Sequence, residues 1–139
     1  MPLAAPLASL PAQLAYPFPP PPRTELSPRE RAVLEAVGLG DLARAEPRIS
    51  SAGALSPGEL QRLAFARCLL RRPAVDLALL DEPTSAVGVQ AACQLFGLLR
   101  AARVTYLSVG QDCEHLRRVH DSHLRFSGRE GGWEIEELP

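Results

Sequence analysis

The most constraining feature of this sequence is the succession of two short stretches. Residues 55–62 read LSPGELQR, and residues 79–85 read LLDEPTS. The first has the pattern of a helix start, and the second has that of a buried strand that ends in two acids. A helix and a strand that follow each other in this way predict an α/β fold, in which ligands gather at the carboxyl ends of the strands.

The helix start carries a candidate phosphate-binding site. Ser56 stands three residues before Glu59, which is the spacing of a capping box. Pro57 suits the first helical position, and Gly58 leaves the backbone open to close approach. We expect this helix over residues 57–72. Its N-terminus favours a phosphate, because unpaired N–H groups and the helix dipole attract an anion, although an ordinary capped helix explains the same residues.

Two acids, Asp81 and Glu82, directly follow the strand that we expect at residues 77–80. An acid at the end of a parallel strand can hold a magnesium ion, and a second acid can orient or deprotonate a water. Considered alone, the two residues also fit a strand that ends in a solvated acidic turn. The helix start and the acidic strand end are informative because they occur together and in this order.

Together these motifs resemble the nucleotide-binding domains of ATP-binding cassette (ABC) transporters. The resemblance implies an α/β fold that is the C-terminal part of a P-loop ABC ATPase domain, with a helical subdomain, part of a parallel sheet and a terminal hairpin. The matching segments are the signature at residues 55–59, the stretch QRLAFAR at residues 61–67, the Walker B strand at residues 77–82 and the start of the D-loop at residues 83–86.

The segment VLEAVGLGDL at residues 33–42 and the LSPGE form of the signature resemble most the cobalamin-transporter type of subfamily D. Three details resemble subfamily D of these transporters, the peroxisomal and lysosomal half-transporters. They are the proline of the signature, the segment LSVG at residues 107–110, and the segment GGW at residues 131–133. The resemblance implies ATP and Mg²⁺ as cofactors. It implies a second half-transporter subunit or nucleotide-binding domain as partner, together with a transmembrane domain outside this chain. It also implies a location on the cytosolic face of a lysosomal or peroxisomal membrane.

The resemblance assigns a role to each candidate site residue. Asp81 would hold Mg²⁺ and Glu82 would polarise the attacking water. Gln111 stands where the family has a histidine that contacts the γ-phosphate, and His115, His120 and His123 are not in register with that position. The signature would close over ATP held by the opposite subunit through Ser56, Pro57, Gly58 and Glu59.

The composition limits what the chain can do by itself. All fifteen basic residues are arginines. A P-loop of the form GxxxxGK[ST] needs a lysine that reaches the β- and γ-phosphates. We therefore expect no ATPase activity from this chain alone, and we expect the signature to act in trans. The net charge of −1 gives no reason to expect a nucleic-acid partner, and no apolar run approaches the 20 residues of a membrane span.

We expect three segments along the chain. Residues 1–26 form a proline-rich loop segment, residues 27–72 form the helical subdomain, and residues 73–139 form the C-terminal part of the ATPase core. Besides the elements above, we expect helices at residues 28–37, 41–45, 86–101 and 113–119, a strand at residues 104–109, and a hairpin of residues 122–126 and 133–136.

Two other functions fit parts of the sequence. One is a catalytically dead interaction module that docks on an intact half-transporter and donates only the signature. The other is a cassette of the DNA-repair type, which shares the signature and the Walker B strand. We disfavour the latter because QRLAFAR and the GGW hairpin resemble transporters and because the chain shows no basic face.

Overall fold

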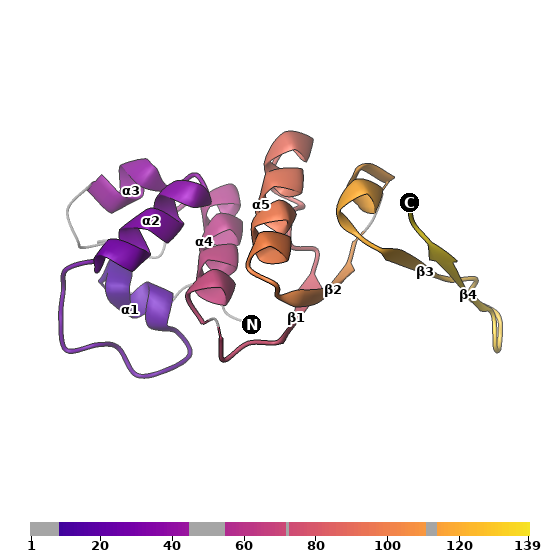
Figure 1. Cartoon of the computed structure of the whole chain (residues 1–139), viewed down its shortest axis with the longest axis horizontal. Helices are drawn as coiled ribbons and strands as arrows, with labels where there is room; N and C mark the ends of the chain where they lie inside the picture. The colour runs from indigo at the N-terminus through magenta and orange to yellow at the C-terminus, as the bar shows by residue number, and fades with distance from the viewer. Residues whose placement is uncertain (1–8, 45–54, 72, 111–113) are drawn as a thin grey trace.

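Helices occupy one end of the molecule, a two-stranded parallel sheet with a covering helix forms the middle, and a β-hairpin projects at the other end (Figure 1). This computed structural model describes residues 9–44, 55–71, 73–110 and 114–139. In chain order the elements are α1 (Leu10–Ala15), α2 (Pro28–Ala36), α3 (Gly40–Arg44), α4 (Pro57–Leu70), β1 (Leu77–Asp81), α5 (Val89–Ala101), β2 (Thr105–Val109), the 3₁₀ helix η2 (Glu114–Val119), β3 (Ser122–Phe126) and β4 (Trp133–Glu137).

Helix α2 begins and ends as the local sequence predicts. The Ser27 N–H donates to the Glu30 carboxylate at 2.7 Å, and the Glu30 N–H donates to the Ser27 hydroxyl at 3.3 Å. This reciprocal pair is a complete capping box. Gly38 then adopts a φ of 80°, a conformation that a glycine reaches without steric cost, and the Leu39 N–H turns back to the Leu34 carbonyl at 2.7 Å.

The proline-rich segment was expected to be a loop, and this expectation is wrong for helix α1. Leu10 and Leu14, one turn apart, are 1% and 3% exposed, and they pack in the same core as α2 and α4. The buried Arg67 of α4 donates from Nε to the Gln13 carbonyl at 2.7 Å. Helix α1 is too short to be stable from its own backbone, so these tertiary contacts stabilise it.

The two strands pair in parallel, as expected, and helix α5 connects them and covers one face of the sheet (Figure 1). Their register pairs Leu77 with Thr105 and Asp81 with Val109, which places the carboxyl ends of both strands at the same edge. Side chains of the opposite face are exposed, whereas we expected strands buried on both sides. This exposed apolar face consists of Leu77, Leu79, Leu107 and Val109, which are 53% to 72% exposed.

An aromatic cluster at the centre of the core joins α4, α5 and β2. The ring of Phe96, a fully buried residue of α5, lies 5.5 Å from that of Phe65 on α4, with the two rings nearly perpendicular. It lies 5.1 Å from the ring of Tyr106 on β2 and 5.0 Å from that of His120, which follows η2. Phe96 therefore contacts aromatic rings from α4, from β2 and from the segment after η2.

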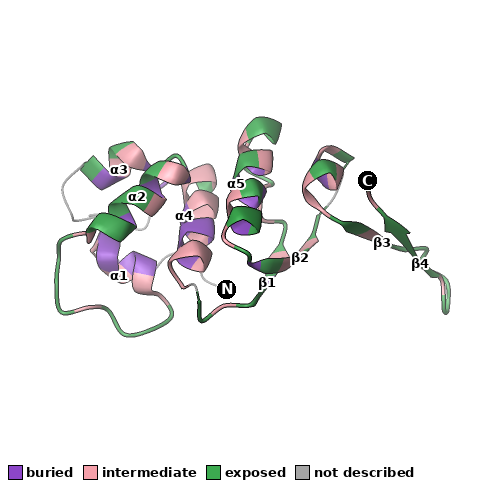
Figure 2. Cartoon of the chain, in the orientation of Figure 1, coloured by how far each residue is buried: buried purple, intermediate pink, exposed green. Residues whose placement is uncertain are grey.

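Two expected helices differ from the structure. Helix α5 begins at Val89, after Gly88 as its N-cap, and not at residue 86. The segment after residue 112 is a 3₁₀ helix from Glu114 and not an α-helix. The terminal hairpin is confirmed, with Phe126 opposite Trp133, and nearly all of it is exposed (Figure 2). Within the described residues, no helix combines the length and apolar character needed to cross a membrane.

Candidate functional site

The start of helix α4 holds a complete capping box between Ser56 and Glu59. The N–H and the hydroxyl of Ser56 each donate to the same carboxylate oxygen of Glu59 at 2.7 Å, and the Glu59 N–H donates back to the Ser56 hydroxyl at 3.3 Å. These two donors hold the pKa of the Glu59 carboxyl below its ordinary value. The helix N-terminus therefore already carries a negative charge, supplied by its own third residue.

This capping box predicts an acid-sensitive contribution to stability. Because the folded-state pKa of Glu59 is lowered, its stabilising effect is present above the ordinary glutamate pKa. That effect is lost as the pH falls through the lower folded pKa. The variant Glu59→Gln keeps an acceptor but cannot titrate, so we expect a smaller loss of stability between pH 7 and pH 3 than in the wild type. Urea denaturation at a series of pH values gives the free energy of unfolding of both proteins. If that free energy falls equally with pH in the wild type and in the variant, the prediction is contradicted.

Gln61 connects the signature helix to the acidic strand end. Its side-chain amide donates to the Ser85 hydroxyl at 2.8 Å and to the Glu82 carbonyl at 3.2 Å, while its carbonyl accepts from the Ala86 N–H at 2.9 Å. One side chain thus pairs with three groups of the turn after β1, at Glu82, Ser85 and Ala86.

Gly58 lies against the same turn. A Cβ atom at this position would stand 2.9 Å from the Ala86 carbonyl oxygen, which is closer than a methyl group can approach. We expected the bare backbone at Gly58 to admit a close neighbour, and that neighbour is the chain itself. Ser56 and Pro57 remain exposed beside this contact. The exposed start of α4 therefore packs directly against the acidic turn.

The two candidate acids lie at the carboxyl end of β1. Asp81 is the last residue of the strand and is exposed. Glu82 has a φ of 41°, in the left-handed region that non-glycine residues rarely adopt. Its N–H donates to the Val109 carbonyl at 2.8 Å, and its own carbonyl accepts from Gln61 and Ser85. These bonds on both sides of the residue hold the strained conformation in place.

These acids suit a magnesium ion that a nucleotide brings with it. Carboxylate oxygens are hard donors, and Mg²⁺ commonly takes only one or two of them together with phosphate oxygens and waters. No group of three or more metal-ligating side chains occurs in the part of the chain that the structure describes. The donor set of Asp81 and Glu82 therefore fits Mg²⁺ bound with phosphates, and it does not fit a metal cage made by protein alone.

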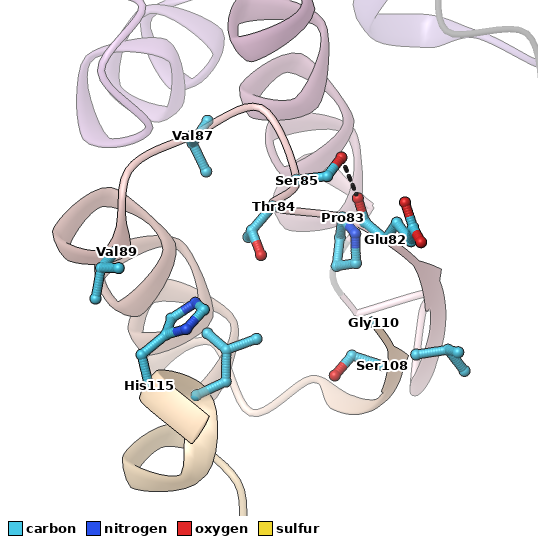
Figure 3. Close-up of a pocket in the computed structure, with 11 residues that line it drawn as sticks. Glu82, Pro83, Thr84, Ser85, Val87, Val89, Ser108, Gly110 and His115 are labelled. Carbon is cyan, nitrogen blue, oxygen red and sulfur yellow. Dashed lines mark hydrogen bonds between the residues drawn. The ribbon is translucent and has the colours of Figure 1, made fainter. Parts of the chain in front are cut away.

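A cavity of about 360 Å³ opens beside this turn (Figure 3). The turn after β1, the end of β2 and the 3₁₀ helix η2 form its walls. Thr84 and Ser108 bring hydroxyl groups to it and His115 brings an imidazole, whereas the Glu82 carboxylate points to the outside (Figure 3). His115 is a half-buried residue of this cavity. Gln111 lies outside the described residues, so its predicted role stays a prediction.

The sequence correctly predicted that the four signature residues lie at a helix start and the two acids at a strand end, and their roles stay predictions. The residues that connect the two segments were missed. The structure brings residues 56–59 and residues 81–82 together through Gln61, which the sequence marked only as part of the stretch after the signature. Ser108 and His120 carried no local signal, because they are twelve residues apart and meet only across the fold.

Comparison with known proteins agrees with this geometry. Residues 21–85 match the ABC transporter family. The chain is therefore similar to ABC transporter ATP-binding domains, and its relatives include members of the D family. ABC transporter D family member 2, chloroplastic, of Arabidopsis thaliana is 39% identical over 114 residues, which cover 76% of this chain and 16% of that protein. The lysosomal cobalamin transporter of Mus musculus is 39% identical over 84 residues, which cover 60% of this chain and 13% of that protein.

Solved structures show the same fold. A bacterial ABC exporter with ATP bound superimposes with a TM-score of 0.63 and 24% identity, covering 84% of this chain and 21% of that one. An ATP-binding cassette of an ABC transporter in its ADP conformation gives a TM-score of 0.53, covering 79% of this chain and 42% of that one. The predicted fold class, the C-terminal part of a P-loop ABC ATPase domain, is confirmed. The chain spans less than half the length of each of these proteins.

Proposed function

We propose that this chain supplies the signature side of an ATP site in a D-family ABC transporter. In this proposal a second nucleotide-binding domain grips the ATP, and the start of helix α4 closes over its phosphates. ATP hydrolysis in the assembled transporter then drives a substrate across an organelle membrane. The observation that carries the proposal is the exposed start of α4, with Ser56 at its surface, held against the Asp81–Glu82 turn by Gln61.

In this proposal we give each residue a distinct task. Ser56 would offer its hydroxyl and Gly58 its backbone N–H to phosphate oxygens of the partner's nucleotide. Glu59 must first release Ser56, because its carboxylate takes both Ser56 donors and repels a phosphate. Asp81 would hold Mg²⁺ and Glu82 would orient a water, in a site whose phosphates are gripped by a P-loop. With no lysine in the chain, that P-loop lies in other sequence.

The location follows from the same resemblance. Relatives of this chain include a chloroplastic D-family member and a lysosomal cobalamin transporter. We place the chain on the cytosolic face of an organelle membrane, lysosomal or peroxisomal, held there by a transmembrane domain in other sequence.

The absence of lysine also favours a second candidate function. In that case the chain docks on an intact half-transporter as an interaction module and donates its signature without any catalysis of its own.

A complementation assay tests the proposed function. The chain is mixed with a D-family nucleotide-binding domain that has an intact P-loop and a disabled signature, and ATP turnover is measured. We expect turnover only in the mixture, and we expect the variant Ser56→Ala to reduce it about tenfold or more, since it removes a phosphate donor. Turnover by the chain alone that is lost in the variant Glu82→Gln would overturn the expectation that it is inactive by itself.

The chain contains a matched control for this assay. Ser27 forms the same capping box at the start of α2, beside Leu70 and Arg71 at the end of α4 opposite the signature. Removing either serine costs about 1 kcal/mol of stability, because each caps one helix. The variant Ser27→Ala should therefore lower the melting temperature about as much as Ser56→Ala and leave turnover in the mixture unchanged. Equal loss of turnover in both variants would mean that Ser56 acts through folding alone.

A further inference from the structure

Ser108 and His120 form a hydrogen-bonded pair that the signature site does not use. The Ser108 hydroxyl lies on strand β2, and His120 follows η2, with 2.8 Å between Oγ and Nε2. The other ring nitrogen, Nδ1, lies 2.9 Å from the Leu116 carbonyl oxygen. A carbonyl oxygen can only accept, so Nδ1 of the neutral ring carries the proton and Nε2 is free to accept from Ser108.

The imidazole of His120 is held in this orientation by its neighbours. Its ring packs against Phe96 at 5.0 Å and stands perpendicular to Tyr106 at 5.1 Å. The Tyr106 hydroxyl in turn donates to the Val119 carbonyl, next to His120 in the chain. A base whose tautomer and ring plane are both set by packing and hydrogen bonds is ready to accept a proton without rearrangement.

The Ser108 hydroxyl faces the cavity beside the acidic turn (Figure 3). The opening is large enough for a small organic group, and much of its wall is apolar. Val87, Val89 and Leu116 supply that apolar surface. Ser85 lines the same cavity, but its hydroxyl is bonded to the Gln61 amide and the Glu82 carbonyl, so no base serves it.

We propose that Ser108 is a reactive nucleophile, with His120 as its general base, toward small activated acyl or phosphonyl compounds that enter this cavity. The Ser108 Oγ attacks the carbonyl carbon or the phosphorus and forms a new bond to it, while the bond to the leaving group breaks. The hydroxyl proton passes to Nε2 of His120. The leaving group departs with the electron pair of the broken bond, and the serine remains covalently modified.

The expected size of the effect follows from general-base catalysis, which accelerates such steps by about 10²- to 10⁴-fold. Ser108 should therefore react at least about 100-fold faster than the other serines of the chain. This inference does not depend on the proposed ATP site. It needs the fold of β2, α5, η2 and the turn after β1 but no bound nucleotide, so a negative result would leave the signature function standing.

The test is covalent labelling of the full 139-residue chain with an alkyl fluorophosphonate, in which serine displaces fluoride. Mass spectrometry of the intact chain gives the rate, and peptide mapping gives the position. We expect one adduct, on Ser108, and none on Ser85. The variant His120→Gln should slow labelling about 100-fold, because an amide can accept the hydrogen bond but not the proton. The exposed Ser122→Ala serves as a control that keeps the wild-type rate.

The wild-type mapping alone can overturn the proposal, so it does not depend on whether a variant folds. Adducts spread over several serines, or no adduct on a chain whose circular dichroism shows its helices, would contradict it. Nitrogen NMR of the histidine rings gives a second measurement. A proton on Nε2 of neutral His120, rather than on Nδ1, would remove the acceptor for Ser108 and would also overturn the proposal.

Discussion

The variant Phe96→Ala should lose about 3–5 kcal/mol of stability, the typical cost of removing a large buried aromatic side chain. Phe96 is fully buried and contacts the rings of Phe65, Tyr106 and His120. Its removal leaves a cavity between α4 and the sheet, which the helices on either side can close only partly. Urea denaturation followed by circular dichroism measures the loss. Small domains have a total stability of only about 5–15 kcal/mol, so we expect a large fraction of the variant to be unfolded.

Phe126 provides the matched control for this prediction. It is the same residue type on the hairpin strand β3, but it is 73% exposed. The variant Phe126→Ala should change stability by no more than about 0.5 kcal/mol, as is usual for exposed sites. Equal losses in the two variants would show that the core does not centre on Phe96, or that the hairpin packs against something in solution.

The variant Gly58→Ala should lose about 1–3 kcal/mol of stability, in the range of overpacked sites. The added methyl group would stand 2.9 Å from the Ala86 carbonyl oxygen, so either α4 or the acidic turn must move. The neighbouring bonds of Gln61 to Glu82 and Ala86 would lengthen with that movement. Amide exchange of the turn after β1 should therefore rise together with the loss of stability.

Gly97 is the control for Gly58, because it is an exposed glycine inside helix α5 with no atom within 4 Å of an added Cβ. The variant Gly97→Ala should gain about 0.5–1 kcal/mol, since alanine favours the helix and nothing opposes the methyl group. Opposite signs for the two substitutions would establish the contact at Gly58. Stabilisation by both would mean that the acidic turn does not lie against the signature helix.

Gln61 links the signature helix to the acidic turn. From within the signature helix, its side chain bonds to Glu82, Ser85 and Ala86 of the acidic turn. A movement of α4 on contact with a partner's nucleotide would therefore reach the backbone of Glu82 directly. The strained φ of Glu82 makes that residue responsive to such a movement, because a conformation held by its surroundings relaxes when they shift.

The sequence by itself determined the local structure. Both capping boxes, the glycine that ends α2, the parallel strands and the terminal hairpin follow from patterns a few residues long. The two acids at the end of β1 and the exposed signature at the start of α4 were predicted for the same reason. Caps and turns satisfy backbone groups within one segment, so the residues that specify them are near in the chain.

Only the tertiary structure decided how these parts meet. The α1 helix exists because Leu10 and Leu14 pack in the shared core, and its length of six residues does not predict it. The Gln61 bonds join residues 21 to 25 positions apart, and the Ser108–His120 pair joins residues 12 apart. Such contacts depend on side-chain packing between elements, which a local pattern does not encode because many partners satisfy the same polar group equally well.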